Sequence, residues 1–324
     1  MSSTVLSKRE ILLAVTFLII GALVSSIAVY GFMAAEISSL KSEIEELEKY
    51  APPKERPIAV ITAFPGELDL IVKEMNKTGK VEVIKIGSWT FFYGTLYGKK
   101  VVAFFSGIGK TNAAAGTELC IARFNPKAII FTGIAGGVPE FADIGDITIS
   151  TAVAHHDYGR VIPPGGLPGV EYPETADLIR GFVPRGVPIF KDGKKLRIVF
   201  FNASTELVDL ALKAAKEIDF GVVPGTNRTP VVRTGIIVTG DQFIASTQKC
   251  EWLYKVFNAL ATEMEGASVA QVAYMHNIPW VIIRCHSDRA DDIAEKIIKE
   301  FWRYAAVNAA KLTLKMVELW PESM

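Results

Sequence analysis

Two segments of the sequence place ionisable side chains at the ends of apolar stretches. The first is Thr262-Glu263-Met264-Glu265-Gly266-Ala267. The second is Arg284-Cys285-His286-Ser287-Asp288, which follows the apolar run Trp280-Val281-Ile282-Ile283. Because an unpaired charge in a buried position is costly, ionisable groups at the end of a buried strand indicate a functional site. Carboxylates held in this way are suited to general acid and general base catalysis.

A further carboxylate and two Gly-rich segments extend this set. Glu67 follows the buried stretch Ile58–Thr62 and stands at the start of a predicted helix. Ligands of α/β folds bind at the carboxyl ends of strands, where glycines let backbone amides approach closely. Taken singly, the acids also fit helix caps or first turns, and the glycines also fit tight turns. The Gly-rich segments are Ser106-Gly107-Ile108-Gly109-Lys110 and Thr132-Gly133-Ile134-Ala135-Gly136-Gly137.

The composition argues against several other kinds of site. The 324 residues carry 35 basic and 35 acidic side chains, so the net charge of zero gives no reason to expect a nucleic-acid partner. His155, His156 and His286 lack the spacing of metal ligands. The three cysteines form neither a disulfide framework nor a metal spacing. We therefore expect no metal and no cofactor.

From Ile58 onward, apolar strands alternate with helices, which predicts a three-layer α/β domain. The Gly- and Pro-rich stretch Gly159–Lys195 is interpreted as a long loop or hairpin insertion. The predicted strands are 58–62, 91–96, 100–105, 128–132, 146–150, 231–239 and 280–285, and the predicted helices are 67–75, 111–124, 263–275, 291–317 and one capped by Ser204 that runs to Ile218.

The N-terminal stretch Ile11–Ala35 contains no charged residue. At about 1.5 Å per residue, a helix of this length crosses a hydrocarbon core of about 30 Å. We expect an uncleaved, single-pass membrane anchor, with signal cleavage near Met33-Ala34-Ala35 as the alternative. Lys8 and Arg9 favour an N-terminus inside the cytoplasm and the bulk of the chain outside it.

Ile37, Leu40, Ile44 and Leu47 follow the anchor at the spacing of a coiled coil. This pattern fits either a short oligomerising coiled coil or a solvated helical stalk, and a Pro-rich linker ends it. The predicted parts are a tail at 1–10, the anchor at 11–35, the stalk and linker at 36–57 and one domain at 58–324.

As a set, the motifs resemble the nucleoside phosphorylase/nucleosidase superfamily, most closely its methylthioadenosine/S-adenosylhomocysteine nucleosidases. The resemblance runs from Ile58 to about Leu319 and implies a central mixed β-sheet flanked by helices, in homodimers or larger assemblies. It is carried by Ala63…Glu67, Ser106-Gly-Ile-Gly-Lys110, Thr132-Gly-x-Ala-Gly-Gly137, His156-Asp157, Gly240-Asp241-x-Phe243-Ile244, Glu263-Met-Glu265 and Arg284-x-x-Ser287-Asp288.

The resemblance implies that the substrate is a purine nucleoside whose N-glycosidic bond is broken. Breaking that bond leaves oxocarbenium character on the ribose and negative charge on the purine, so an acid and a base are required. By resemblance, Asp288 is the acid that protonates purine N7, and Ser287 orients it. Glu67 is the base that positions water at C1′. Asp288 must then have a raised pKa, as burial would produce.

The resemblance also assigns residues that bind the substrate. Glu265 is expected to hold the ribose hydroxyls, with Met264 packed on the sugar and Arg284 supporting that region. Phe243 is expected to stack on the base, and the main chain of Ile244 to read the purine edge. The remaining positions carried over are Ala63, Ile108, Ala135 and Gly136.

The sequence favours water over phosphate as the nucleophile. Phosphorylases of this superfamily bind phosphate through arginines and a Ser/Thr, and the corresponding positions here are Phe131 and Ile134. A dianion without cationic partners binds poorly. The expected activity is hydrolysis of methylthioadenosine, S-adenosylhomocysteine or adenosine-like nucleosides to adenine and a ribose derivative. The alternatives are a purine nucleoside phosphorylase and a non-catalytic nucleoside-binding or storage protein of the same fold.

Overall fold

The structure is a computed structural model that describes residues 8–48, 51–322 and 324. The chain divides into two compact units, residues 1–51 and 52–324. Most of the predicted tail, residues 1–7, lies outside the described residues, as do residues 49 and 50 of the predicted stalk and linker.

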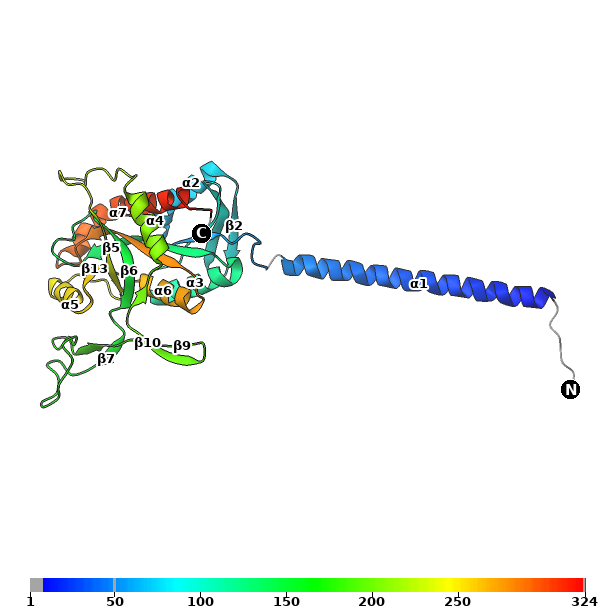
Figure 1. Cartoon of the computed structure of the whole chain (residues 1–324), viewed down its shortest axis with the longest axis horizontal. Helices are drawn as coiled ribbons and strands as arrows, with labels where there is room; N and C mark the ends of the chain where they lie inside the picture. The colour runs from blue at the N-terminus through cyan, green and yellow to red at the C-terminus, as the bar shows by residue number, and fades with distance from the viewer. Residues whose placement is uncertain (1–7, 49–50, 323) are drawn as a thin grey trace. The chain divides into compact units, whose positions relative to one another are not determined.

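The first unit is one helix, α1 (Lys8–Glu48) (Figure 1). Its stretch Val15–Ile44 has a mean hydropathy of 2.2 and is not buried, so it is long and apolar enough to cross a membrane. The hydroxyls of Thr16, Ser25 and Ser26 each donate to the carbonyl four residues earlier at 2.8 Å. These polar groups are therefore satisfied within the helix, as a hydrocarbon environment requires. A signal sequence near the N-terminus has the same length and composition.

The predicted border between anchor and stalk at 35/36 does not interrupt α1, which continues to Glu48. The reason is physical: Glu36 and the residues after it are good helix formers, so a change from apolar to charged composition does not end the helix. Ile37, Leu40 and Ile44 are half-exposed on α1, and the side chain of Leu47 lies outside the described residues.

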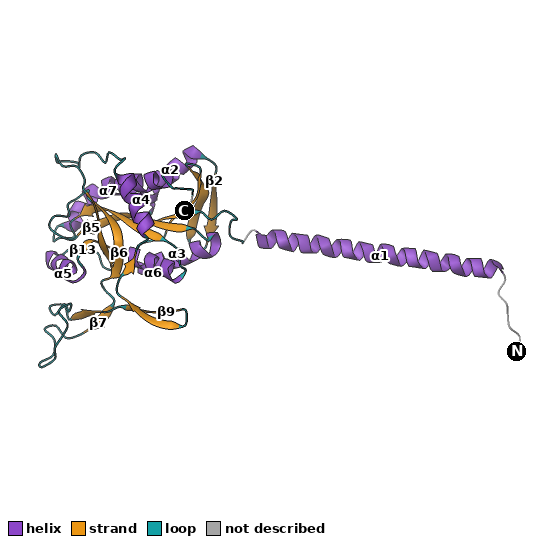
Figure 2. Ribbon diagram, viewed as in Figure 1, coloured by secondary structure: helices purple, strands orange, loops and turns teal. Residues whose placement is uncertain are grey.

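The second unit is built on a mixed β-sheet with helices on both faces (Figure 2). Its strands lie in the order β11-β6-β12-β13-β5-β1-β4-β3-β2, and β14 pairs with β5 and β6. The pairs β1–β4, β1–β5 and β5–β14 are parallel, whereas β5–β13 and β6–β14 are antiparallel. The expectation of a three-layer α/β/α fold with a central mixed sheet is confirmed. The sheet strands are β1 (Ile58–Thr62), β2 (Val81–Ile86), β3 (Trp89–Leu96), β4 (Lys99–Phe105), β5 (Ala128–Gly137), β6 (Ile147–His155), β11 (Phe201–Asn202), β12 (Val232–Thr239), β13 (Ala259–Glu263) and β14 (Trp280–Asp288).

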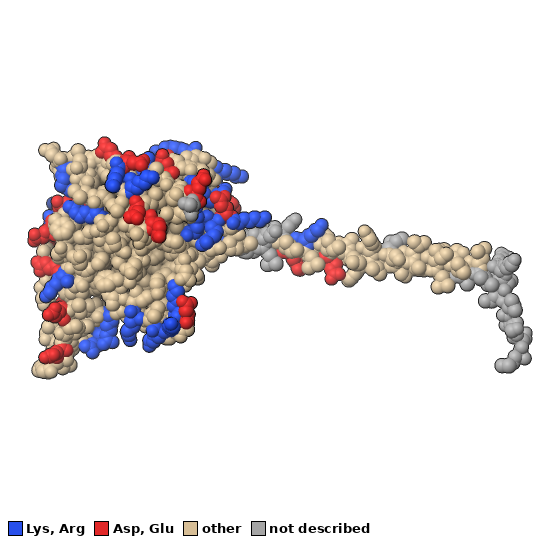
Figure 3. Space-filling view, viewed as in Figure 1, with Lys and Arg blue, Asp and Glu red and all other residues tan. Residues whose placement is uncertain are grey.

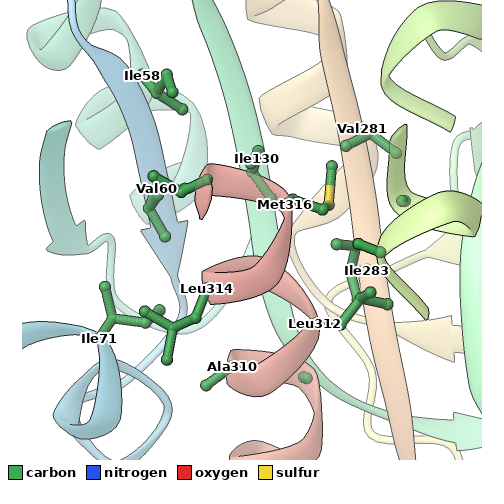
Figure 4. Close-up of a cluster of buried hydrophobic side chains, with 14 of the residues drawn as sticks. Ile58, Val60, Ile71, Ile130, Val281, Ile283, Ala310, Leu312, Leu314 and Met316 are labelled. Carbon is green, nitrogen blue, oxygen red and sulfur yellow. The ribbon is translucent and has the colours of Figure 1, made fainter. Parts of the chain in front are cut away.

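The core lies on both faces of this sheet because the central strands alternate two sets of apolar side chains. Ile58 and Val60 of β1 face one cluster, whereas Ala59 and Ile61 face the other. The first cluster is shown in Figure 4, where Leu312, Leu314 and Met316 of α7 lie over β1, β5 and β14. The second packs under α3 and α6. The helices of this unit are α2 (Pro65–Thr78), α3 (Lys110–Phe124), α4 (Thr205–Ala215), α5 (Thr247–Phe257), α6 (Gly266–Met275) and α7 (Ala294–Glu318).

The stretch Gly159–Lys195 forms two small sheets that project from the body of the unit (Figures 1 and 2). β7 (Gly159–Val161) pairs with β8 (Phe182–Pro184), and β9 (Val187–Lys191) pairs with β10 (Lys194–Ile198). The interpretation as a hairpin insertion therefore holds for its second half.

Several predicted elements differ from the structure. The predicted helix 263–275 is instead strand β13 up to Glu263 followed by α6 from Gly266, because Glu263 pairs in the sheet with Thr239. The predicted strands 128–132 and 280–285 continue to Gly137 and Asp288, since each pairs with the other along its length. Ser204 precedes α4, but its hydroxyl donates to Glu206 rather than capping the helix. The final helix begins at Ala294 rather than at Asp291.

Candidate active site

A cavity of about 160 Å³ opens where β1, β5 and β14 end. It brings together residues from stretches that lie far apart in the sequence. Of the predicted site residues, Ala63, Glu67, Ile108, Ala135, Gly136, Phe243, Met264, Glu265, Arg284, Ser287 and Asp288 line it. Ile244 lines a smaller adjoining cavity of about 30 Å³, which shares Gly136, Phe243, Met264 and Asp288 with the first.

Glu67 is held rigidly at the first turn of α2. Its Oε2 accepts the backbone N–H of Ala63 at 2.8 Å and its Oε1 accepts that of Ile134 at 2.7 Å. The side chain is buried, and Nη1 of Arg284 lies 3.8 Å from Oε1. Burial raises the pKa of Glu67, against the opposing effect of Arg284 and the backbone donors. The carboxylate is therefore fixed in direction and more basic than an exposed one.

The close approach of the Glu67 carboxylate to strand β5 depends on the absence of a side chain at Gly133. A Cβ there would lie 2.2 Å from Oε1 of Glu67 and 2.5 Å from Nη1 of Arg284. Gly136 plays the same part at the other carboxyl group, because its Cβ would lie 2.9 Å from Oδ1 of Asp288. The two glycines of β5 thus leave room for the acids of two other elements.

Arg284 is buried at the centre of an acidic cluster. Its Nη2 donates to Oε2 of Glu263 and lies 3.2 Å from Oε2 of Glu265. Its guanidinium also lies 4.5 Å from the ring centroid of Phe131. One cation therefore serves the carboxylates of Glu67, Glu263 and Glu265, which leaves the cluster with an excess of negative charge when all three are ionised.

Glu263 belongs to the site although the sequence assigned it no role. Its carboxylate accepts from the hydroxyl of Thr239 and from the backbone N–H groups of Glu265 and Gly266, the latter at 2.7 Å. These bonds fix the bend between β13 and α6. The bend in turn presents Met264 and Glu265 to the cavity. A buried acid two residues before another acid was the available sequence signal.

Glu265 is tied to the Gly-rich segment that follows β4. Its Oε1 accepts the backbone N–H of Gly109 at 2.8 Å. That segment is itself held by Lys110, whose Nζ donates to Oδ1 of Asp157 at 2.6 Å and whose backbone N–H donates to Asp241 at 2.8 Å. Burial and the nearby Glu263 raise the pKa of Glu265 to about 7.

Asp288 is buried at the end of β14. Its Oδ2 accepts from the hydroxyl of Ser287 at 2.8 Å, and its Oδ1 accepts the backbone N–H of Ala290 at 2.8 Å. The register with β5 shifts between His286 and Asp288, so the neighbours Ser287 and Asp288 both line the cavity. Burial raises the pKa of Asp288 to about 6, which suits a group that gives up a proton near neutral pH.

Within the described residues, no group of three or more His, Cys, Asp or Glu side chains is placed to hold a metal ion. His286 is buried and its Nε2 lies 2.9 Å from the hydroxyl of Thr148, and burial lowers its pKa to about 4. It is a neutral packing residue beside the site.

One side of the cavity is apolar. Phe64, Ile108, Ile134 and Ile298 line it, and Phe64 packs edge-on against Trp302 of α7 at 5.7 Å between ring centroids. Phe243 also lines the cavity and is 45% exposed. Thr262 also lines the cavity, and its buried hydroxyl has no partner among the described residues. Phe64 and Ile298 are lining residues that the sequence reasoning missed. Ile134, Thr262 and Glu263 lay in the predicted motifs, but the sequence reasoning gave them no place in the substrate-binding site.

The chain is similar to known proteins in sequence and in fold. A sequence profile described as "Phosphorylase superfamily" matches residues 57–318. The 5'-methylthioadenosine/S-adenosylhomocysteine nucleosidase of Oceanobacillus iheyensis is 33% identical over 262 residues, which are 81% of this chain and 98% of that protein.

Solved structures are similar over the same region. The nucleosidase of that name from Neisseria meningitidis, in complex with methylthio-immucillin-A, has a TM-score of 0.64 at 32% identity and covers 81% of this chain and 99% of its own. The futalosine hydrolase of Helicobacter pylori has a TM-score of 0.64 at 27% identity and covers 81% of this chain and 97% of its own.

Proposed function

Because the chain belongs to the phosphorylase superfamily and is an N-glycosyl hydrolase of adenosine-type nucleosides, we propose that its substrates are 5′-substituted adenosines. Methylthioadenosine and S-adenosylhomocysteine are the first candidates, and adenine and the 5′-substituted ribose are the products. The observation that carries this proposal is the convergence of Glu67, Glu265 and Asp288 on one cavity with an apolar side.

Asp288 is the proposed acid. A pKa of about 6 lets its carboxyl hold a proton at mildly acidic pH and release it to purine N7 as the glycosidic bond breaks. The hydroxyl of Ser287 is 2.8 Å from Oδ2 and orients the carboxyl group. Neutralising the leaving purine lowers the barrier because the base departs as a neutral molecule.

Glu67 is the proposed base. Backbone N–H groups on both carboxylate oxygens fix its direction, and burial raises its pKa above the ordinary value. A carboxylate in this setting can accept a proton from water while directing the oxygen toward C1′. The water and the purine then lie on opposite faces of the ribose.

The acidic cluster supports the charge that develops on the ribose. Glu265 is proposed to hold the ribose hydroxyls, with Met264 against the sugar. Arg284 keeps Glu265 and Glu263 in place while leaving the cluster negative overall. When these carboxylates are ionised, their excess of negative charge near the sugar favours an oxocarbenium-like transition state over the neutral substrate.

The two ends of the cavity suit the two ends of a 5′-substituted adenosine. Phe243, with Ala135 and Gly136, lines the side near Asp288, where Phe243 is proposed to stack on the purine and the main chain of Ile244 to read its edge. Ala63, Phe64, Ile108 and Ile298 surround the remaining space. An apolar 5′ substituent such as a methylthio group would bury its surface there.

Water is the proposed nucleophile, because the cavity offers a phosphate dianion few hydrogen-bond donors or positive charges. Among its described lining residues the only basic side chain is Arg284, whose guanidinium already faces three carboxylates. The backbone N–H of Ile134 is also occupied, by Glu67. Phosphate would meet negative charge rather than free donors.

The setting of the enzyme is proposed as well. Ile11–Ala35 is proposed to be a single-pass anchor with the catalytic domain outside the cytoplasm, because Lys8 and Arg9 precede the apolar stretch. The chain is also proposed to self-associate as a homodimer or larger assembly.

Product analysis on a nucleoside panel tests the activity. The panel contains methylthioadenosine, S-adenosylhomocysteine, adenosine, inosine and futalosine, each with and without phosphate. We expect adenine to be released from methylthioadenosine and S-adenosylhomocysteine at a rate that phosphate does not change. The Glu67→Gln variant should release none. Adenine release that requires phosphate would indicate a phosphorylase. Preferred cleavage of futalosine would replace 5′-substituted adenosines as the proposed substrates. Nucleoside binding without release of the base would indicate a storage protein.

A further inference from the structure

The β9–β10 hairpin presents a basic and aromatic outer face. Between Arg185 and Arg197 the chain carries five basic residues and one acidic residue, Asp192, although the whole chain is neutral. Cross-strand pairing sets Phe190 opposite Lys195 and Pro188 opposite Arg197, so these four side chains share one face. Phe190 is 74% exposed, and Nζ of Lys195 lies 5.7 Å from its ring centroid. Figure 3 shows Lys and Arg side chains gathered at the edge of the unit where the hairpin projects.

The opposite face of the hairpin holds it firmly to the body. Ile189 is buried in the cluster under α3 and α6, with Val187 and Ile198 packed against that cluster. Nζ of Lys191 donates to the carbonyl of Tyr274 and to Oδ1 of Asn277, both at 2.6 Å. The exposure of Phe190 is therefore a fixed property of the fold rather than the result of a loose loop.

The N-terminal helix keeps this unit close to any bilayer that it enters. Nine residues, 49–57, separate the end of α1 from β1, and an extended chain of that length spans about 30 Å. A compact unit of about 270 residues has a radius of gyration of about 18 Å. The predicted anchor ends at Ala35, so the helical residues 36–48 add about 20 Å to this linker. The whole tether is thus about as long as the unit's diameter, and the surface of the unit can reach the lipid headgroups.

We propose that the outer face of the β9–β10 hairpin docks on anionic lipid headgroups of the bilayer that holds α1. This goes beyond the proposed activity and rests on α1 being in the membrane. The basic side chains of Lys195 and Arg197 bind the headgroup phosphates, and Phe190 enters the interface beside them. An exposed aromatic ring among cations matches a surface that is apolar below a layer of negative charge.

A second copy of the chain fits this face less well. In a two-fold symmetric contact the same patch lies on both partners, so two hairpins meeting there would place like charges opposite each other. A bilayer supplies the complementary charge and is already tethered to the same chain.

Site-specific lipid quenching tests the docking. The full chain carrying Phe190→Cys is labelled with a fluorophore and reconstituted into vesicles that contain a spin-labelled lipid. The native cysteines at 120, 250 and 285 are buried, so the label goes to the new thiol. Vesicles of phosphatidylglycerol with phosphatidylcholine are compared with vesicles of phosphatidylcholine alone. Val83→Cys on β2, where Val83 is 55% exposed, is the matched control.

We expect the fluorophore at position 190 to be quenched in vesicles that contain phosphatidylglycerol and not in phosphatidylcholine alone. The fluorophore at position 83 should not be quenched in either. Quenching at 190 should be lost at about 0.5 M salt, where the Debye length is about 4 Å. Each basic side chain contributes about fivefold to such binding, so Lys195→Gln/Arg197→Gln is expected to reduce the docked-to-undocked ratio about 25-fold. The matched double variant Lys80→Gln/Lys85→Gln, on exposed residues elsewhere, is expected to leave this ratio unchanged.

Equal quenching at 190 and 83, or quenching that does not depend on anionic lipid, would overturn the proposal. Quenching that rises with the protein-to-lipid ratio whatever the headgroup would assign the face to a second copy and overturn it too. Nucleoside hydrolysis by the same samples reports the proposed activity separately, so the failure of one does not imply the failure of the other.

Discussion

The hydroxyl of Ser287 lies 2.8 Å from Oδ2 of Asp288, its neighbour in the sequence, and both side chains line the same cavity. In a regular strand adjacent side chains point to opposite faces. The register shift of β14 against β5 removes that restriction. The proposed acid therefore carries its own orienting group, and its behaviour can be tested without disturbing another element.

The activity is expected to be highest on the acid side of neutrality. Asp288 must be protonated to act as the acid, and its pKa is about 6, so kcat/KM should fall about tenfold per pH unit above that value. Glu67 must be ionised, and its pKa is raised above 4.5, so kcat/KM should also fall at lower pH. Initial rates of adenine release from pH 4 to 9 measure both limbs. A flat profile between pH 6 and 8 would exclude Asp288 as the acid.

Asp288→Asn is expected to abolish turnover, to preserve ligand binding and to stabilise the fold at high pH. The folded-state pKa of Asp288 is above its unfolded value, so the folded chain holds the proton more tightly. The free energy of unfolding therefore decreases as pH rises from about 4 to about 6, by about 3 kcal/mol in total. The variant should have a higher Tm than the wild type at pH 8, and the two should converge at pH 4. Asp69→Asn, at an exposed position, is the control. A variant less stable than the wild type at pH 8 would contradict this account.

Gly133→Ala is expected to inactivate the enzyme at least 100-fold. The new methyl group would lie 2.2 Å from Oε1 of Glu67, so the proposed base or the strand must move, and small displacements at a reaction centre cost about that factor. Gly79→Ala is the control, because a Cβ there meets its nearest atoms at 3.6 Å or more. Steady-state kinetics of both variants decide the matter. Normal rates in Gly133→Ala would mean that the position of Glu67 is not critical.

Arg284→Met is expected to destabilise the catalytic unit by about 3–5 kcal/mol, because it leaves the buried carboxylates of Glu67, Glu263 and Glu265 without their cation. The loss should be larger at pH 8 than at pH 5, where the carboxyl groups take up protons. Chemical unfolding at the two pH values measures it. Arg303→Met, at an exposed arginine, should change stability by less than about 1 kcal/mol.

The N-terminal helix is expected to remain on the mature protein. The membrane fraction should then contain a chain of 35.4 kDa that resists extraction by alkaline carbonate, whereas a variant lacking residues 1–56 should be recovered in the soluble fraction. Intact mass spectrometry measures the outcome. A new N-terminus near Ala34 or Ala35 would establish a signal sequence instead of an anchor.

The layers of the fold were predictable because strand and helix patterns are local features of the sequence. The residues that meet in the cavity were predicted from the family resemblance of the motifs as a set. Prediction from the sequence failed where pairing decided the structure. Strand β13 (Ala259–Glu263) was not predicted, and the predicted helix began at its last residue, Glu263. Pairing with β12, which local composition does not show, makes this short segment a strand. The Thr132–Gly137 segment has the composition of a turn, but its pairing with β14 extends β5 through it.

The missed lining residues have the same explanation. Ile298 lies near the start of α7, and no local pattern indicates that this helix reaches the cavity. Glu263 has the residue type of a site acid, but its part depends on the bend that its own hydrogen bonds create.

The shared guanidinium of Arg284 has a consequence for how this active site can evolve. Three acids draw on one positive charge, so neutralising any one of them changes the proton affinity of the other two. Substitutions at these positions will show strong epistasis, and their effects will not add. Adapting the pocket to another nucleoside would require coordinated replacements, while changes at the apolar rim can accumulate one at a time.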